Sequence, residues 1–138
     1  MSATDLENYR PSKDEPFMND RQKEYFKRKL HDWRNDILKE NKDTLEQLQE
    51  ESLHLADIAD RASSETDKAI ELRTRDRQRK LISKIDKALR KIDIDEYGYC
   101  EETGEPISLA RLEARPIATL SLEAQERHER SEKVHRDD

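Results

Sequence analysis

Apolar residues recur at coiled-coil spacing in two long stretches of the chain. In the first stretch the steps are 4, 3 and 4 residues, over Phe26, Leu30, Trp33 and Ile37. In the second the steps are 4, 4 and 3 residues, over Leu81, Ile85, Leu89 and Ile92. Such spacing places the apolar side chains on one face of a helix. The pattern predicts two long helices that each bury a narrow apolar stripe.

The limits of these helices are marked by polar residues rather than by glycine or proline. Neither glycine nor proline occurs between residues 17 and 97. Asn19 can cap the first helix, with Gln22 three residues later in a capping-box arrangement. The apolar pattern slips near residues 52–59, and a second helix is expected from Asp57 or Asp60 to about Ile94. Folding back at this point would give an antiparallel hairpin.

The sequence therefore predicts an all-α protein, with a long antiparallel coiled-coil hairpin on a small globular base. Residues 1–18 are expected to form an N-terminal arm that docks on the base. Residues 19–94 form the coiled coil, with its tip near 52–60. Residues 95–120 form a degenerate zinc-finger-like knuckle, and residues 121–138 a C-terminal helix, for which Ser121 is a good N-cap.

Composition favours long exposed helices over a large core. Of the 138 residues, 43% are charged and 32% hydrophobic, and the net charge is −6. Binding to free nucleic acid is not expected from such a chain, because duplex affinity depends mostly on neutralising phosphates. No apolar run is long enough for a membrane span, and the polar N-terminus does not resemble a signal peptide. A single cysteine cannot form an internal disulfide, and a cytoplasmic location is expected.

The sharpest turns of the chain gather in one short segment, residues 97–116. It holds both glycines, Gly98 and Gly104, and the only cysteine, Cys100. A zinc knuckle needs two thiolates in a Cys-x-x-Cys turn, but here Thr103 follows Cys100 after two residues. Cys100 could instead be a redox-sensing thiol, although the adjacent Glu101 and Glu102 are expected to raise its pKa.

Charged residues cluster at two places in the predicted hairpin. Asp57 and Asp60 lie three residues apart at the expected tip, where carboxylates commonly cap a helix. A dense basic run follows further along, over Arg73, Arg75, Arg77, Arg79 and Lys80. Alternate residues of a helix point in different directions, so these side chains cannot all share one face. A solvated helix surface is the simplest interpretation of the run.

Several motifs in order make the chain resemble the DksA/TraR family of bacterial regulators that bind RNA polymerase. They are FxRxLxxWRN from Phe26 to Asn35, AxxADRA from Ala56 to Ala62, LRxRDRxRKLIxKI from Leu72 to Ile85, GYC from Gly98 to Cys100, and RLEARP from Arg111 to Pro116. The resemblance covers roughly residues 17–130. The family's four zinc-ligand positions correspond to Cys100, Thr103, Ser121 and Ala124.

The resemblance implies three sets of binding residues. In the family the hairpin enters the secondary channel of the polymerase and its tip approaches the catalytic centre, which points to Asp57, Asp60 and Ala62. Arg77 matches an arginine that helps hold the polymerase. Family positions for the alarmone ppGpp, at the interface with the polymerase, match Leu81, Lys84 and Arg115, with Arg111 close by in sequence. A lysine of that family site is Gln125 here, which removes one charge.

The ligand positions do not suit zinc. Threonine and serine hydroxyls are poor zinc ligands, and alanine cannot coordinate a metal. His128, one helical turn beyond Ala124, would bring the donors only to two. We therefore expect a knuckle that folds without zinc. A second interpretation of Arg111 and Arg115 is that they pair with Glu113, Asp93 or Asp95 and orient the knuckle.

The expected function is regulation of promoter open-complex stability in the stringent response, together with ppGpp. A monomer is expected, without sequence-specific DNA binding and without contact to a membrane. No catalytic triad, P-loop or phosphate-binding glycine loop is visible, so no enzymatic activity is expected. Two alternatives remain: a coiled-coil adaptor without an active-site role, and a transcript-cleavage factor whose tip carboxylates bring Mg²⁺.

Overall fold

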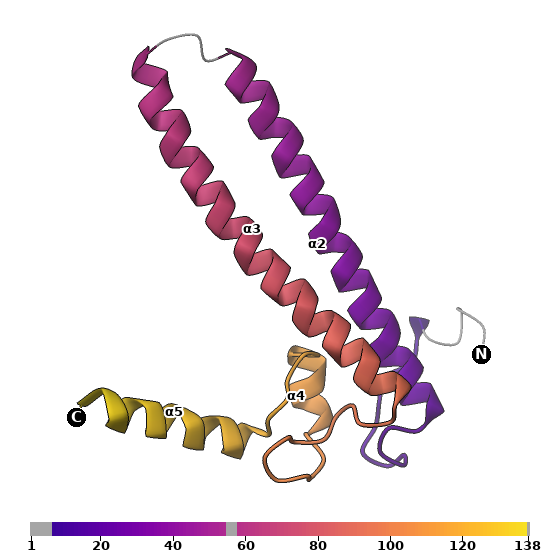
Figure 1. Cartoon of the computed structure of the whole chain (residues 1–138). Helices are drawn as coiled ribbons and strands as arrows, with labels where there is room; N and C mark the ends of the chain where they lie inside the picture. The colour runs from indigo at the N-terminus through magenta and orange to yellow at the C-terminus, as the bar shows by residue number, and fades with distance from the viewer. Residues whose placement is uncertain (1–6, 55–57, 138) are drawn as a thin grey trace. The chain divides into compact units, whose positions relative to one another are not determined.

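Helices account for most of the described part of the chain. The computed structural model describes residues 7–54 and 58–137, and four helices are labelled in Figure 1. They are α2 (Asp20–His54), α3 (Ile58–Asp93), α4 (Leu109–Ala114) and α5 (Leu122–Asp137). Within these residues there is no β-strand, only an isolated bridge between Tyr99 and Pro106. The predicted all-α fold with two long helices is confirmed.

The chain is divided into two compact units. The hairpin unit comprises His31–Asp86, and the terminal unit comprises Met1–Leu30 together with Lys87–Asp138. Both long helices contribute residues to each unit, because α2 and α3 continue through the division. The candidate binding residues of the hairpin, which lie between positions 57 and 84, therefore belong to a different unit from the knuckle residues.

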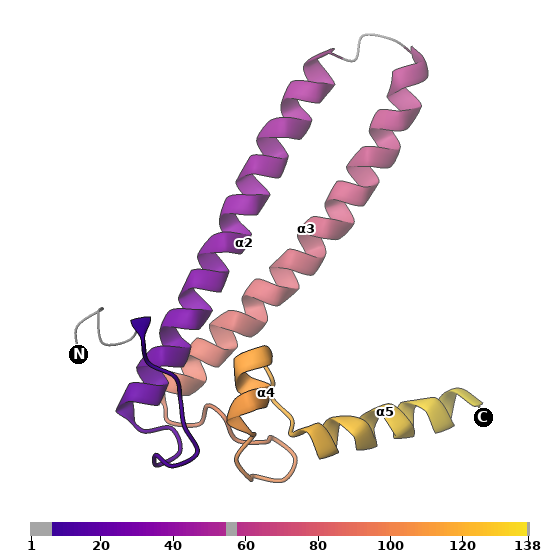
Figure 2. The same cartoon turned by 180° about the vertical axis from the view of Figure 1, so that it is seen from behind.

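In the hairpin unit, α2 and α3 lie side by side and run in opposite directions, as Figures 1 and 2 show from two sides. The apolar seam is represented by Ile37, 5% exposed, and Ile85, fully buried. An ion pair of 2.9 Å between Arg34 and Asp86 joins the helices. Further along, the seam becomes polar and borders a half-open cavity of about 310 Å³, lined by Asn41, Thr44, Asp67, Ile70, Glu71, Thr74, Arg75 and Gln78.

The terminal unit has a small aromatic and aliphatic core. Phe26, Leu30 and Leu112 are fully buried, and the rings of Phe26 and Tyr97 lie 5.6 Å apart. On α3 the buried residues are Ala88 and Ile92, whereas Leu89 is only half-buried. The predicted seam residue Leu89 is thus half-buried, as Leu81 is, and the small side chain of Ala88 next to it is buried as well.

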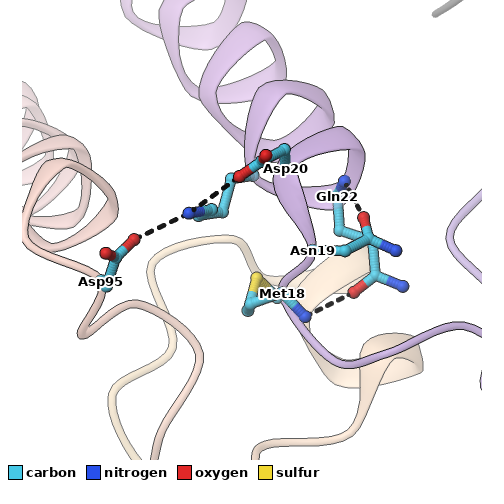
Figure 3. A network of polar contacts seen from close by, with 6 residues as sticks. Met18, Asn19, Asp20, Gln22 and Asp95 are labelled. Atoms are coloured by element: carbon cyan, nitrogen blue, oxygen red, sulfur yellow. Dashed lines mark hydrogen bonds and ion pairs between the residues drawn. The ribbon is translucent and has the colours of Figure 1, made fainter.

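The first turn of α2 is capped by the segment before it. The Asn19 side chain accepts a hydrogen bond of 2.8 Å from the backbone N–H of Gln22, as the predicted cap requires. The Gln22 side chain accepts from the N–H of Met18 instead of Asn19, at 2.7 Å (Figure 3). Gln22 is fully buried, and its amide also donates to the Ser12 carbonyl. It thus secures the N-terminal segment to the start of the helix.

Candidate functional site

The knuckle is built around Cys100 by backbone hydrogen bonds. The Cys100 N–H donates to Glu105, and its carbonyl accepts from Gly104, both at 2.8 Å. The Ile107 N–H donates to the Gly98 carbonyl at 2.7 Å. Both glycines have positive φ, 90° at Gly98 and 75° at Gly104, a conformation that L-residues rarely adopt. The two glycines of the chain therefore lie where the turn requires them.

Side chains of the following segment close the knuckle. The Tyr97 hydroxyl is buried and donates to the Pro116 carbonyl at 2.7 Å. The Glu101 N–H donates to the Thr119 carbonyl at 2.8 Å. Ile107 is 1% exposed and Leu112 fully buried, so apolar packing also holds the turn. Tyr99 is exposed on one side and stacks edge-on against Phe17 at 5.3 Å.

The four family zinc positions do not form a metal-binding set. The Thr103 hydroxyl accepts from the Glu105 N–H, and the Ser121 hydroxyl accepts from the Ala124 N–H as the predicted cap of α5. Ala124 is fully buried and has no donor atom. His128 lies 3.4 Å from Glu102. Within the described ranges no group of three or more histidine, cysteine, aspartate or glutamate side chains could hold a metal. These residues do not fit zinc.

The Cys100 thiol is more acidic than its sequence neighbours predict. Only 2% of the residue is exposed. Burial raises the pKa of the thiol, but hydrogen bonds from the Thr103 hydroxyl and from the backbone of Ser121, Thr103 and Glu102 outweigh it, and the pKa is lowered to about 6. The expectation that Glu101 and Glu102 raise this pKa was wrong, because donors surround the sulfur more closely than carboxylates do. A buried thiolate is nevertheless poorly accessible to oxidants.

The RLEARP segment forms α4 and uses its charged residues differently. Glu113 lies 3.0 Å from Lys29 and 4.0 Å from Arg10. The Arg111 guanidinium donates to the Leu120 carbonyl at 2.8 Å. Arg115 ends the helix, is exposed, and makes no side-chain hydrogen bond or ion pair with the other described residues.

The expected pairing of Arg111 and Arg115 with nearby acids was therefore wrong. Asp93 pairs with Lys27 at 3.7 Å and Asp95 with Lys23 at 2.7 Å, the latter also in reach of Asp20 (Figure 3). Lysines of α2 reach these carboxylates from a distant part of the sequence. Sequence reasoning missed these lysines, because Lys23 and Asp95, for example, are 72 residues apart and no local pattern signals their contact.

The structure describes some of the candidate binding residues of the hairpin but not others. Asp57 lies outside the described residues, and Asp60 and Ala62 belong to the first turns of α3, where their side chains are not described. Arg77 and Lys84 are exposed on α3 and make no ion pair with another described residue, whereas Leu81 is half-buried. Gln125, at the family's lysine position, donates to Glu129 on α5 at 3.2 Å.

The basic run separates into paired and unpaired members. Arg75 pairs with Glu71 at 2.9 Å, and Arg79 with Asp76 at 3.7 Å. Arg73, Arg77 and Lys80 are exposed and have no hydrogen bond or ion pair to other described residues. The run thus leaves a subset of its cations available to a partner.

A long helical hairpin together with a zinc-finger-like knuckle defines the class of protein, and comparison with known proteins specifies it further. Residues 22–92 match the N-terminal domain of the DnaK suppressor protein DksA. Residues 95–130 match the prokaryotic dksA/traR C4-type zinc finger. The chain belongs to the DksA/TraR family. Its knuckle is a member of the zinc-finger family that keeps one of the four cysteines.

Curated relatives match over nearly their whole length. A Caulobacter vibrioides protein named RNA polymerase-binding transcription factor DksA is 72% identical over 131 residues, which cover 95% of this chain and 92% of that protein. The protein of the same name from Salmonella typhimurium is 42% identical, covering 89% and 82%. The structure of transcription factor DksA2 from Pseudomonas aeruginosa matches with a TM-score of 0.80 and 36% identity, covering 94% and 97%.

None of the described helices is long and apolar enough to cross a membrane. The relatives carry the name of a transcription factor rather than of an enzyme.

Proposed function

We propose that this protein is a transcription regulator that binds bacterial RNA polymerase through its secondary channel. The observation that carries the proposal is the 72% identity, over 95% of the chain, to an RNA polymerase-binding transcription factor. On this basis the hairpin enters the channel and changes the stability of promoter open complexes during nutrient stress. The chain needs no chemistry of its own for this role, since position and charge act on the polymerase.

The tip carboxylates Asp57 and Asp60, with Ala62, are the proposed effector. Carboxylates brought near a bound Mg²⁺ ion or its neighbouring loops change the local field without forming a bond. Arg77 is proposed as a holding residue. Its exposed guanidinium has no partner among the described residues, so it is available for an acidic group of the polymerase.

We further propose that ppGpp acts at the interface with the polymerase through Lys84 and Arg115, with Leu81 beside Lys84 on α3. Arginine binds phosphate with a planar fork, and lysine adds a point charge. Arg115 is exposed and unpaired within the described part of the chain, which supports this role. Arg111 is a weaker candidate, because its guanidinium already donates to the Leu120 carbonyl. Gln125 supplies no charge, so weaker coupling to ppGpp is expected.

The test is transcription in vitro on a promoter with a short-lived open complex, with and without ppGpp. The double variant Asp57→Asn/Asp60→Asn is expected to bind polymerase as the wild type does but to inhibit poorly. If both proteins inhibit equally, the carboxylates are helix caps and the effector proposal fails. If the wild type does not bind polymerase, the result would favour the alternative of a coiled-coil adaptor without an active-site role. Shortened transcripts on stalled polymerase would favour the cleavage alternative.

A further inference from the structure

The half-open cavity of the hairpin unit lies between α2 and α3, the two helices that run side by side in Figures 1 and 2. Its volume of about 310 Å³ is at the lower end of the range of small-molecule sites, roughly 300–1,000 Å³. The lining residues of α3 extend from position 67 to position 78, at steps that keep them on one face of the helix. This stretch is about 16 Å long. The cavity is therefore long and narrow, and its shape suits an extended chain better than a ring system.

One lining side chain directs an unpaired acceptor into this space. The Oε1 atom of Gln78 is buried and has no hydrogen-bond partner among the described residues. Burial of a carbonyl oxygen without a partner is destabilising. A ligand with an N–H group at this place would satisfy the oxygen, so the cavity favours a hydrogen-bond donor.

The other polar groups of the lining divide into engaged and unengaged side chains. Glu71 pairs with Arg75 at 2.9 Å, and the Thr74 hydroxyl donates to the Ile70 carbonyl at 3.0 Å. Four lining side chains make no hydrogen bond or ion pair with another described residue, namely Asn41, Thr44, Asp67 and Gln78. Each of the four offers an oxygen acceptor, so the lining can receive several N–H groups from one ligand.

The charge of the lining selects a cation. The carboxylates of Asp67 and Glu71 are countered only by Arg75, and the other members of the basic run do not line the cavity. On α2 the exposed acids Glu40 and Asp43 directly precede the two lining residues of that helix. A positively charged ligand is thus favoured over a neutral or anionic one.

The apolar part of the lining is aliphatic. Ile70 is 55% exposed although it lines the cavity, and no aromatic residue belongs to the lining. An alkyl segment of a ligand would cover the Ile70 side chain and remove apolar surface from water. An aromatic ligand would find no ring to stack on.

We propose that the cavity binds a linear aliphatic polyamine. One ammonium group pairs with the Asp67 carboxylate, an N–H group near the other end donates to Gln78 Oε1, and an alkyl segment lies on Ile70. The ion pair between Glu71 and Arg75 lies between the two ends and stays intact. The site goes beyond the proposed function, because it requires the hairpin alone and no polymerase.

The test titrates spermine into the full chain at constant ionic strength, in the absence of polymerase. The side-chain amide signals of Asn41 and Gln78 in NMR spectra should shift in a saturable way, and calorimetry measures the affinity. Spermine is long enough to reach from one end of the cavity to the other. Putrescine is too short to do so and is expected to bind at least about tenfold more weakly, because it loses one of the two end contacts.

Two variants remove one end contact each. Asp67→Asn and Gln78→Leu are each expected to weaken spermine binding by about threefold to tenfold. Asp76→Asn is the matched control for the charge, because Asp76 pairs with Arg79 and does not line the cavity. Gln47→Leu, on the exposed surface of α2, is the control for the amide. Both controls should bind spermine as the wild type does.

Gln78→Leu also separates binding from stability. It replaces an unpaired buried acceptor by apolar atoms, so it should lose the ligand while the hairpin stays folded. The proposal is overturned if spermine leaves the amide signals of Gln78 unchanged, since the cavity then holds water only. It is equally overturned if Asp76→Asn weakens binding as much as Asp67→Asn, which would show a diffuse attraction to an acidic chain. Polymerase binding is measured separately, so a failure of the proposed function would leave this result unchanged.

Discussion

The Lys29 ammonium lies 3.0 Å from the Glu113 carboxylate and ties α4 to α2 within the terminal unit. Both side chains are partly buried, 34% and 27% exposed. Burial raises the pKa of Glu113, but the Tyr25 hydroxyl and the Lys29 ammonium outweigh it, so the pKa lies below its ordinary value. The contact links residues 84 positions apart and sets where the RLEARP segment lies in the terminal unit.

Replacing Glu113→Gln is expected to lower the free energy of unfolding by about 1 kcal/mol at neutral pH, because a charge-assisted contact is lost. A carboxyl whose pKa is lowered by folding stabilises the protein above its unfolded pKa and loses that effect as pH falls. The difference from wild type should therefore disappear as pH falls below 4.5, the unperturbed value. Urea unfolding at several pH values measures it. Glu96→Gln, an exposed residue of the same unit, serves as control, and an equal loss there would contradict the assignment.

Alanine substitutions at the two glycines of the knuckle are expected to differ in their effect on stability. A Cβ at Gly98 would meet the Phe17 ring at 3.0 Å, whereas a Cβ at Gly104 would meet no atom within 4 Å. Both positions have positive φ, so alanine costs about 1 kcal/mol at either. Gly98→Ala should cost more than Gly104→Ala, because Phe17 must also move. Thermal unfolding of the two variants tests which one loses more stability. Equal losses would show that the Phe17 ring can move aside at no measurable cost.

The polar seam of the hairpin unit can be stabilised. Gln78 lines the cavity, and its Oε1 atom is buried with no hydrogen-bond partner among the described residues. Gln78→Leu removes this acceptor and places apolar atoms in the cavity, so the free energy of unfolding should rise by about 1 kcal/mol. Gln47→Leu, on the exposed surface of α2, is the matched control and should change stability little. A loss of stability in Gln78→Leu would mean that the amide is paired in solution.

The knuckle should fold without zinc. Thr103 and Ser121 hydroxyls are engaged with backbone N–H groups, and Ala124 has no donor. Elemental analysis after purification without added metal should give far less than one zinc per chain. A chelator should leave the thermal midpoint unchanged. Stoichiometric zinc, or a midpoint that falls with chelator, would refute the prediction.

Cys100 should titrate far below an ordinary thiol. Its pKa is lowered to about 6 from the usual 9.0. A group whose pKa falls on folding contributes stability above its unfolded pKa, and that contribution is lost as pH falls through the folded value. Between pH 9 and 6 the wild type should therefore lose stability with falling pH relative to Cys100→Ala. Ultraviolet absorbance of the thiolate, with Cys100→Ala as blank, follows the titration, and a midpoint near 9 would contradict the hydrogen-bond geometry.

Caps and turns were well predicted because they depend on neighbours in the sequence. Asn19 and Ser121 each accept the hydrogen bond that a helix N-terminus needs, within three residues of their own position. Gly98 and Gly104 likewise occupy the positive-φ positions of the knuckle. The seam was predicted nearly as well, since helical periodicity is a local property, although Ala88 is more deeply buried than the expected Leu89.

Ion pairs were not predicted, because charged side chains are long and many partners lie within reach. Glu113 was expected beside an arginine of its own segment, but Lys29 and Arg10 reach it after the chain has folded. The division of the basic run into paired and unpaired members was hidden in the same way. Only the structure shows which basic residues are already paired and which are left for a partner.

By itself, the sequence determined the helical fold, the positions of the caps and the loss of the zinc ligands, since each depends on residue type and short-range spacing. Tertiary structure alone decided the acidity of Cys100, the partners of Glu113 and the unpaired state of Arg73 and Lys80 within the described residues. These properties depend on electrostatics and burial, which arise from groups that are distant in the sequence and meet only when the chain folds.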